Sequence, residues 1–185
     1  MQKSLLRSVL KAKRAEISHI LEDYKPLLAQ NTIPELLALL SITDKVAGYY
    51  PINSEFDCLF ILKSLIKHGI EVSLPVVGEG KVMKFKAWNG DEALLGPGKF
   101  GVPIPICEGN FVDPDMILVP MLGFNNRGYR IGYGGAFYDN TLPHHPRAKT
   151  IGLAFKNQLC EEFQEEPHDV KLNSIITEEG VFPLL

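Results

Sequence analysis

Apolar and polar positions alternate over the first twenty residues with the period of a helix. At about 100° per residue, one side of that helix gathers apolar side chains, which are Leu5, Leu6, Val9, Leu10 and Ile17. The opposite side carries a stripe of cations, which are Lys3, Arg7, Lys11 and Arg14. The pattern therefore predicts an amphipathic first helix whose basic face is, on its own, most simply a solvated surface.

Residues 45–77 predict a complete β-α-β unit. A short apolar strand, "VAGYY", precedes a helix that we expect from Ser54 to about Lys67, and "IEVSLPVV" forms the next strand. Ser54 followed by Asp57 resembles a capping box at the start of that helix. Nearly continuous apolar strands separated by a helix are typical of a parallel sheet covered on both faces.

The rest of the chain predicts further strands and one more helix. Residues 31–41 ("NTIPELLALLS") indicate a helix with a polar cap and a proline in its first turn. Residues 89–110 are rich in Gly and Pro and predict mostly loop. Strands are expected at 82–88, 115–121, 149–155 and 173–181. Because no repeat or linker interrupts this pattern, we expect one α/β domain over residues 1–185. Its mostly parallel central sheet would be flanked by helices on both faces in a Rossmann-like three-layer arrangement.

Composition narrows the class of protein. The 185 residues are 45% hydrophobic and 22% charged, as in ordinary globular proteins, and a net charge of −3 gives no sign of a nucleic-acid partner. The three cysteines form no CxxC pair, which argues against a zinc knuckle or a disulfide framework and fits a reducing compartment. No apolar run reaches the roughly 20 residues that span a bilayer. We expect a cytoplasmic protein without a membrane partner, although the basic amphipathic start leaves a mitochondrial transit peptide open.

The segment "GYRIGYGGAFYDNTL" (residues 128–142) is the densest candidate for chemistry. It lacks the GK[ST] of a Walker A loop, and Phe137 stands where the dinucleotide fingerprint needs a glycine. Nevertheless, Gly132, Gly134 and Gly135 leave backbone N–H groups unshielded, and the residues after them can start a helix whose N-terminus favours anions. Arg127 and Arg130 lie just upstream and can pair with phosphate oxygens. A glycine-rich surface turn remains the alternative.

Three other side chains are candidates for ligand contact. Asp139 offers the hard oxygen that Mg²⁺ prefers, or is a structural aspartate. Glu55, in the first turn of the predicted helix after "VAGYY", favours that helix terminus or accepts hydrogen bonds from an amine- or amide-rich ligand. Trp88 and Phe100 pack in the core or stack on a planar heterocycle. Ligands in open α/β sheets bind beyond the carboxyl ends of the strands, where Glu55 and the glycine segment are expected.

Taken together, these segments resemble the 5-formyltetrahydrofolate cyclo-ligase (methenyltetrahydrofolate synthetase) family. The resemblance runs from "KSLLRSVLKAKRAEIS" through "YYPINSEFD", "VSLPVV", "MKFKAW" and "GPGKFGVPIP" to "ILVPMLGFNNRGYRIGYGGAFYDNTL" and "HDVKLNSIITEEG". It implies a fold similar to phosphosugar isomerase and CoA-transferase-like folds, and an ATP- and Mg²⁺-dependent ring closure. ATP phosphorylates the formyl oxygen of 5-formyltetrahydrofolate, N10 attacks the formyl carbon, and phosphate leaves. The products are 5,10-methenyltetrahydrofolate, ADP and phosphate. The resemblance further implies a monomer that acts on this small-molecule substrate.

The resemblance also implies roles for single residues. The implied catalytic residues are Lys3, Arg130 and Asp139, and the implied metal ligands are Asp139 and Asp169. The implied ATP contacts are Lys3, Ser4, Leu5, Leu6, Arg7, Arg130, Ile131, Gly132, Tyr133, Gly134, Gly135, Ala136, Phe137 and Tyr138. The implied folate contacts are Tyr50, Glu55, Trp88, Tyr133, Gly134, Gly135, Ala136 and Phe137. Lys11 and Arg14 are expected to stay mainly solvated.

Three departures from the family pattern bear on these expectations. The loop reads "GYGGAFYD" where the bacterial family usually has "GYGGGYYD". If Ala136 needs a positive φ, its methyl group costs about 1 kcal/mol or more. Phe137 lacks a phenolic hydroxyl, and Asn173 stands where an aspartate is often found. None of these changes removes an implied ligand.

Two alternatives of other classes remain. One is a nucleotide- or RNA-binding paralogue that kept the fold without the reaction, against which stands the joint presence of Lys3, Arg7, Glu55, Asp139 and Asp169. The other is a phosphosugar isomerase or CoA-transferase-like enzyme on a similar sheet. An isomerase needs a well-placed general base, and the sequence indicates none.

Overall fold

A mostly parallel sheet forms the centre of the molecule in the computed structural model. The structure describes residues 3–20, 25–41 and 44–185, with only the backbone for 25–31. In spatial order the main sheet contains β12 (Gly180–Phe182), β11 (Ser174–Thr177), β10 (Lys149–Leu153), β7 (Met116–Val119), β1 (Lys45–Ala47), β2 (Glu71–Val77), β3 (Met83–Trp88) and β6 (Phe111–Val112). Strands β11, β10, β7, β1 and β2 run parallel, and the outer strands pair antiparallel. The predicted α/β class is confirmed.

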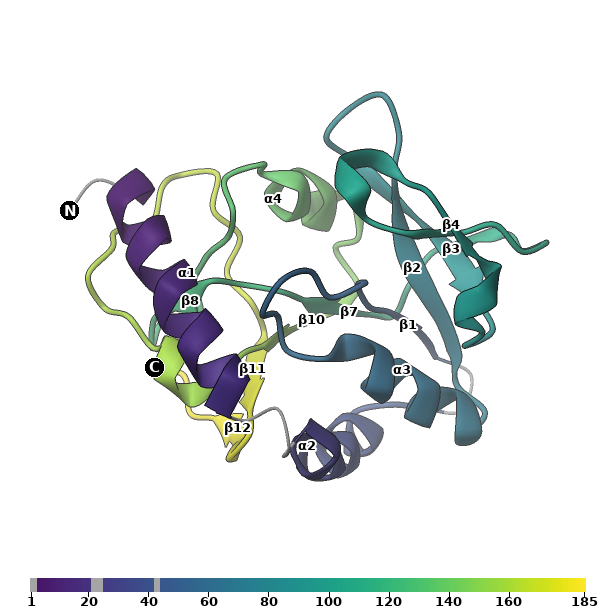
Figure 1. Ribbon diagram of the computed structural model, residues 1–185, viewed down its shortest axis with the longest axis horizontal. Helices are drawn as coiled ribbons and strands as arrows, with labels where there is room; N and C mark the ends of the chain where they lie inside the picture. Colours follow the sequence, from purple (N-terminus) through teal and green to yellow (C-terminus); the bar gives the residue numbers. More distant parts are fainter. Residues whose placement is uncertain (1–2, 21–24, 42–43) are drawn as a thin grey trace.

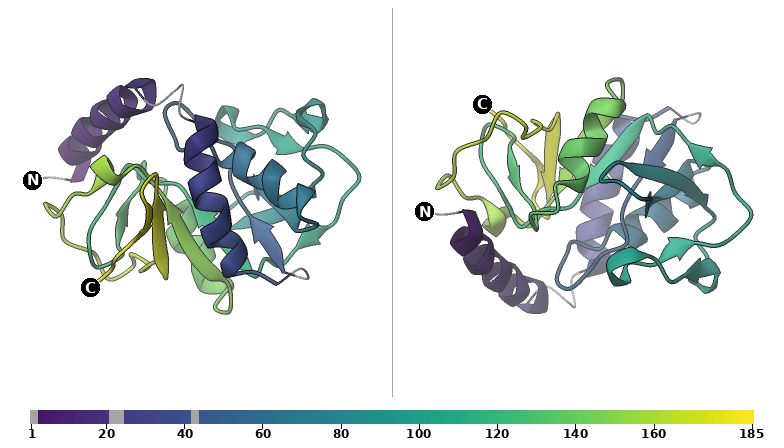
Figure 2. Two further views of the ribbon diagram at one scale, coloured as in Figure 1. Left: turned by 90° about the horizontal axis from the view of Figure 1, so that it is seen from below. Right: turned by 90° about the horizontal axis from the view of Figure 1, so that it is seen from above.

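Helices lie on both faces of this sheet. The helices are α1 (Lys3–Ile20), α2 (Lys25–Ala38), α3 (Cys58–Lys67) and α4 (Phe137–Thr141), with short 3-10 turns at Glu92–Leu94, Lys99–Gly101, Leu142–His144 and Lys156–Gln158. Helices α2 and α3 cover one face and α4 lies on the other, while α1 stands at the side (Figures 1 and 2). Two small two-stranded sheets pair β4 (Leu95–Gly96) with β5 (Ile104–Pro105) and β8 (Gly123–Phe124) with β9 (Arg130–Ile131). None of the helices within the described ranges is both long and apolar enough to span a membrane.

The core explains why the central strands read as continuous apolar runs. All four residues of β7 are buried, because the helical layers cover both faces of the sheet. Leu65 of α3 lies with Leu118 in the cluster under α2 and α3, whereas Ile117 lies with Leu142 in the cluster on the α4 side. This alternation of neighbouring strand residues is the period-2 geometry of a β-strand.

The first helix buries a different face from the one that the apolar pattern predicts. Leu6 and Leu10 are buried as expected, but Leu5 and Val9 are 57% and 51% exposed. Arg14 is only 1% exposed, so the prediction that it is solvated is wrong. The reason is tertiary: the inward face of α1 packs partly on the apolar cluster that contains Leu6 and Leu10 and partly on polar loops, so it carries both residue types.

Two helices begin at other residues than predicted. Helix α2 begins at Lys25, and Pro34 lies inside it rather than in its first turn. Burial of Ile33 and Leu36 in the core offsets the hydrogen bond that Pro34 cannot donate. Helix α3 begins at Cys58, because Asp57 is its N-cap and accepts a hydrogen bond from Phe60 N at 3.3 Å.

Two predicted strands also differ in extent. Strand β1 ends at Ala47, three residues before the end of "VAGYY". The predicted last strand is instead a hairpin, in which β11 pairs antiparallel with β12. Gly180 begins β12 with φ 106°, a conformation that glycine adopts readily and that turns the chain back within a few residues.

Candidate active site

A cavity of about 520 Å³ lies beyond the carboxyl ends of two central strands. Tyr49 and Tyr50 follow β1, Pro120 follows β7, and all three line the cavity. The other walls come from α1, from the glycine segment 130–139, and from the stretches 99–104 and 166–169. The cavity therefore lies where ligands bind in open α/β sheets, as the sequence predicts.

Residues 132–136 of the glycine segment form a tight loop between β9 and α4. Gly134 has φ 98°, and a Cβ placed there would lie 3.3 Å from Cζ of Arg7. Arg7 Nε also donates a hydrogen bond to the carbonyl oxygen of Gly132 at 3.1 Å. The positive φ favours glycine at position 134, and any side chain there would also press against the guanidinium of Arg7.

Ala136 adopts the left-handed conformation, with φ 56° and ψ 19°, at the N-cap of α4. Because Cβ is unfavourable in this region, Ala136→Gly is expected to raise the free energy of unfolding by about 0.5–1 kcal/mol, as measured by urea denaturation. The matched control is Ala12→Gly on the exposed side of α1, which is expected to lower it by about 1 kcal/mol. A loss of stability in both variants would contradict strain at position 136.

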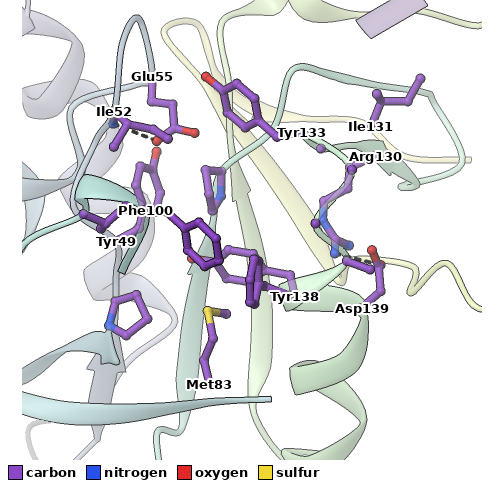
Figure 3. A pocket seen from close by; sticks show the side chains of 18 of the residues that line it. Tyr49, Ile52, Glu55, Met83, Phe100, Arg130, Ile131, Tyr133, Tyr138 and Asp139 are labelled. Carbon is purple, nitrogen blue, oxygen red and sulfur yellow. Dashed lines mark hydrogen bonds and ion pairs between the residues drawn. The ribbon is translucent and has the colours of Figure 1, made fainter. Parts of the chain in front are cut away.

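Ion pairs and hydrogen bonds between cations and carboxylates connect the chain segments at one end of the cavity. Arg130 donates to Asp139 Oδ1 at 2.8 Å and to the carbonyl oxygen of Val170 at 3.1 Å, and its side chain is 4% exposed. Val170 N donates to the same Asp139 oxygen at 3.3 Å. Lys3 Nζ lies 3.1 Å from an oxygen of Asp169. The start of α1, β9, α4 and the stretch before β11 therefore meet at one end of the cavity, where Figure 3 shows Arg130 paired with Asp139.

The same end offers ligands for a hard divalent cation. Glu166, His168 and Asp169 place one ligand atom each within 4.8 Å of one another. Asp139 is not part of that group, but it also lines the cavity and is bonded to the residue that follows Asp169. Carboxylate oxygens are the ligands that Mg²⁺ prefers. The residues present therefore fit such an ion.

The opposite end of the cavity contains a buried carboxylate. Glu55 is 8% exposed and lies in the loop before α3, so its predicted place in the first turn of that helix is wrong. Ile52 N donates to Glu55 Oε2 at 3.0 Å, and Arg14 lies 3.7 Å from Oε1. Burial raises the pKa of the Glu55 carboxyl, while the Ile52 N–H and Arg14 oppose that rise. The site thus holds a desolvated acceptor for N–H groups.

Aromatic side chains line the space between the two ends. Figure 3 shows Tyr49 on the same side as Glu55 and Tyr138 nearer to Arg130 and Asp139. Burial raises the pKa of both tyrosines well above the usual value, so both phenols stay neutral donors. Phe100 is 76% exposed, and its ring centroid lies 5.5 Å from that of Phe137. These rings give the cavity flat apolar walls suited to a planar ligand.

Most residues that the sequence singles out meet at this cavity. Those that line it are Lys3, Arg7, Tyr50, Glu55, Arg130, Ile131, Gly132, Tyr133, Gly134, Gly135, Ala136, Phe137, Tyr138, Asp139 and Asp169. Ser4 and Leu5 are exposed on α1, and Leu6 is buried under it. Trp88 is 3% exposed in the core and donates its indole N–H to the carbonyl oxygen of Asp91 at 3.0 Å. These four do not line the cavity.

Sequence reasoning missed several polar residues of the site. Lys11 is exposed as expected but also lines the cavity, whereas Arg14, expected in solvent as well, is buried behind it. Glu166 and His168 lie beside Asp169, and their side chains are 3.3 Å apart. Their closeness in sequence to Asp169 was an available signal. No local pattern marks Arg14, because its partners are distant in sequence.

The fold and this cavity together define a class of protein. A doubly covered, mostly parallel sheet carries one cavity with a glycine loop and cations at one end and a buried carboxylate at the other. Such convergent polar groups in an apolar cavity at the carboxyl edge of the sheet are typical of α/β enzymes.

Comparison with known proteins narrows that class to one family. Residues 1–178 match the sequence profile of the 5-formyltetrahydrofolate cyclo-ligase family, and the chain belongs to this family. The 5-formyltetrahydrofolate cyclo-ligase of Mycolicibacterium smegmatis is 29% identical over 184 residues, which cover 95% of this chain and 93% of the relative. The family is one of ligases, so the chain is an enzyme of that class.

Solved structures agree in fold. The structure of Aquifex aeolicus 5,10-methenyltetrahydrofolate synthetase matches with a TM-score of 0.79 and 32% identity, over 100% of this chain and 93% of that one. A 5,10-methenyltetrahydrofolate synthetase from Mycoplasma pneumoniae matches with a TM-score of 0.73 and 26% identity, over 96% and 99%. The similarity therefore extends over the whole sheet and its helices.

Proposed function

We propose that this enzyme converts 5-formyltetrahydrofolate to 5,10-methenyltetrahydrofolate with ATP and Mg²⁺, releasing ADP and phosphate. The observation that carries the proposal is one cavity with two chemically different ends. A cationic glycine loop lies at one end and the buried Glu55 carboxylate at the other, with aromatic walls between them. A nucleotide phosphate suits the first end, and the N–H-rich edge of a pterin suits the second.

The ATP phosphates would bind at the cationic end. Gly132, Gly134 and Gly135 leave backbone N–H groups accessible, and Arg7 and Lys3 reach the cavity from α1. Phosphate oxygens are strong acceptors, so they favour clustered N–H donors and guanidinium groups. Mg²⁺, when bound near Asp139 and Asp169, would neutralise phosphate charge. We expect these cations to release their present carboxylate and carbonyl partners as ATP enters.

The pterin would bind at the Glu55 end. Its amino and amide N–H groups would donate to the Glu55 carboxylate, while Tyr50 and Tyr133 border the ring. Phe100 and Phe137 supply exposed flat surface at the cavity wall. Trp88 is left out of this proposal, because it is buried in the core and outside the cavity.

The proposed reaction has two bond exchanges. The formyl oxygen attacks the terminal phosphorus of ATP, and ADP leaves. N10 then attacks the formyl carbon and loses its proton to solvent, and the C–O bond breaks to release phosphate. Phosphoryl transfer needs positioning and positive charge rather than a protein nucleophile, and Lys3 and Arg130 supply that charge. Holding N10 against the formyl carbon contributes up to several kcal/mol as an orientation effect.

A direct assay tests this proposal. Purified protein is mixed with 5-formyltetrahydrofolate and Mg-ATP, and the near-ultraviolet absorbance of the methenyl product is followed. The signal is expected to need both ATP and Mg²⁺, as omission of ATP and addition of EDTA would verify. No ATP-dependent signal from well-folded protein would contradict the proposal and favour a binding paralogue without the reaction. We also propose a monomer as the active species.

Asp139→Asn tests the proposed metal role. The amide keeps the shape of the side chain but loses its charge, so the Mg²⁺ concentration that gives half the maximal rate is expected to rise about tenfold. The measurement is the rate against Mg²⁺ at saturating ATP and folate. Asp113→Asn, at a carboxylate 87% exposed, is the matched control. An unchanged Mg²⁺ titration for Asp139→Asn would count against metal ligation.

A further inference from the structure

Arg14 is a buried cation that does not line the cavity. Its side chain is 1% exposed, which is unusual for a charged residue and requires that its donors be satisfied. Arg14 Nε donates to the Ser54 hydroxyl at 3.2 Å, and one terminal nitrogen donates to the carbonyl oxygen of Met121 at 2.8 Å. The other terminal nitrogen donates to the Tyr133 hydroxyl. The planar guanidinium thus joins three separate segments to α1.

Two of these segments form the folate end of the cavity. Glu55 lies in the segment held through Ser54, and its Oε1 is 3.7 Å from Arg14. Tyr133 belongs to the glycine loop and is 41% exposed. Figure 3 shows Glu55 and Tyr133 close together at one end of the cavity, although they come from different loops. Arg14 bridges them from behind through Ser54 and Tyr133, and Asn53 Nδ2 also donates to the Tyr133 hydroxyl at 3.4 Å.

Arg14 is also the charged side chain that opposes the rise in the Glu55 pKa, and it lies 3.7 Å from Oε1 of Glu55. Tyr49 follows β1, Cys58 begins α3 and Tyr138 lies on α4, and the negative charge of Glu55 adds to the rise in the pKa of all three. Burial raises the pKa of each of these groups, so they are neutral at physiological pH. Without Arg14 the desolvated Glu55 carboxylate would have no counter-charge.

We propose that Arg14 is a positioning residue, which holds the Glu55 carboxylate charged and fixed beside Tyr133 so that the folate meets a preformed acceptor. This inference rests on the proposed function, because it assigns the folate to the Glu55 end. Arg14 acts through Glu55 and Tyr133 and touches no substrate. A residue needed only for folding would show no such dependence on the charge of Glu55.

The first test needs no ligand. The carboxyl carbon of Glu55 is followed by ¹³C NMR between pH 5 and 9, and its signal is assigned by its absence in Glu55→Gln. In Arg14→Met the midpoint of the Glu55 titration is expected to move to higher pH, because the opposing cation is gone. Lys13→Met, on the exposed side of the same helix, is the control and should titrate as the wild type does. An unchanged midpoint in Arg14→Met would overturn the proposal.

The second test measures 5-formyltetrahydrofolate affinity without ATP by fluorescence titration. Arg14→Met is expected to bind about tenfold more weakly than the wild type at pH 7, since a charged acceptor is lost. The difference in folate affinity between Arg14→Met and the wild type should narrow as pH rises, because the Glu55 carboxyl ionises again. A difference that stays constant with pH would indicate a merely structural role. Failure of the wild type to bind would contradict the proposed function but leave the titration result standing.

Removal of one partner from a buried ion pair can prevent folding, so Arg14→Met alone could fail to fold. A double variant keeps the test decisive in that case. Arg14→Met combined with Glu55→Gln removes both charges, and Arg14→Lys keeps the charge without the planar fork. If Arg14 acts through Glu55, adding Arg14→Met to Glu55→Gln should weaken folate binding by no more than about threefold. Arg14→Lys should weaken folate binding more in the wild-type background than in the Glu55→Gln background. Equal losses in both backgrounds would overturn the proposal.

Discussion

Replacing Glu55 by glutamine is expected to weaken 5-formyltetrahydrofolate binding about tenfold or more, while ATP affinity changes by no more than about twofold. The amide keeps the length of the side chain and can still accept the hydrogen bond that Ile52 N donates to Glu55 Oε2. What it loses is negative charge at a buried position, where a charge-assisted hydrogen bond is strongest. Separate titrations of each ligand by calorimetry measure the effect.

The same side chain predicts a pH dependence. Burial raises the pKa of Glu55 above the usual value for a glutamate, 4.5, and the ionised form is the one proposed to bind folate. Folate affinity should therefore fall as pH is lowered through this raised pKa, at a higher pH than an exposed glutamate would give. In Glu55→Gln that step should disappear, since the amide does not titrate.

Glu71→Gln is the matched control, because Glu71 is exposed at the start of β2 and does not line the cavity. It should bind both ligands as the wild type does. Equal weakening of folate and ATP by Glu55→Gln would contradict the assignment of Glu55 to the folate end. It would indicate instead that Glu55 supports the cavity as a whole through Arg14.

Local patterns were sufficient for the main elements of the fold. The run of apolar residues in β2 and β7 reports burial on both sides of a sheet, which is a property of neighbouring positions alone. The glycine segment was readable in part: the condition considered for Ala136, a positive φ, is met in the structure, where its φ is 56°. Such features depend on a few consecutive residues, so a short stretch of sequence is enough to predict them.

The first helix shows where local patterns fail. Periodicity places Leu5 and Val9 on one face and Arg14 on another, but it does not say which face meets the rest of the protein. In the structure Leu5 is 57% exposed and Arg14 is buried among partners at positions 54, 121 and 133. A buried cation is favourable only when other segments supply its hydrogen-bond acceptors. Because these acceptors lie outside the helix, the helix sequence alone does not predict them.

The candidate site was predictable in part for the same reason. Glu55 was a candidate because it follows β1, and the segment that contains Arg130 was one because it comes after β7, whose carboxyl end lies at the same edge of the sheet. Trp88 was not placed correctly, since its indole N–H finds an acceptor at Asp91 and its ring fits the core. Whether an aromatic faces a cavity or the core depends on packing that no short segment encodes.

Replacing Arg130 by methionine is expected to lower kcat by about two to three orders of magnitude, with folate affinity changed by no more than about threefold. Arg130 holds Asp139 at 2.8 Å and the carbonyl oxygen of Val170 at 3.1 Å, so it fixes both carboxylate-bearing segments of the ATP end. It also brings positive charge to the place where phosphoryl transfer is proposed, far from Glu55 in the cavity (Figure 3). Steady-state rates at saturating ligands and separate folate titrations measure the two effects.

Two further variants separate charge from geometry at this position. Arg130→Lys keeps the charge but replaces a planar fork with a single ammonium group, so its kcat should fall between those of Arg130→Met and the wild type. Arg147→Met removes an exposed arginine after α4 and should leave kcat unchanged. If circular dichroism shows Arg130→Met to be folded and its kcat equals that of the wild type, Arg130 has no part in phosphoryl transfer. If Arg130→Lys is as slow as Arg130→Met, the planar guanidinium that orients Asp139 matters more than the positive charge, because lysine keeps the charge but not the planar group.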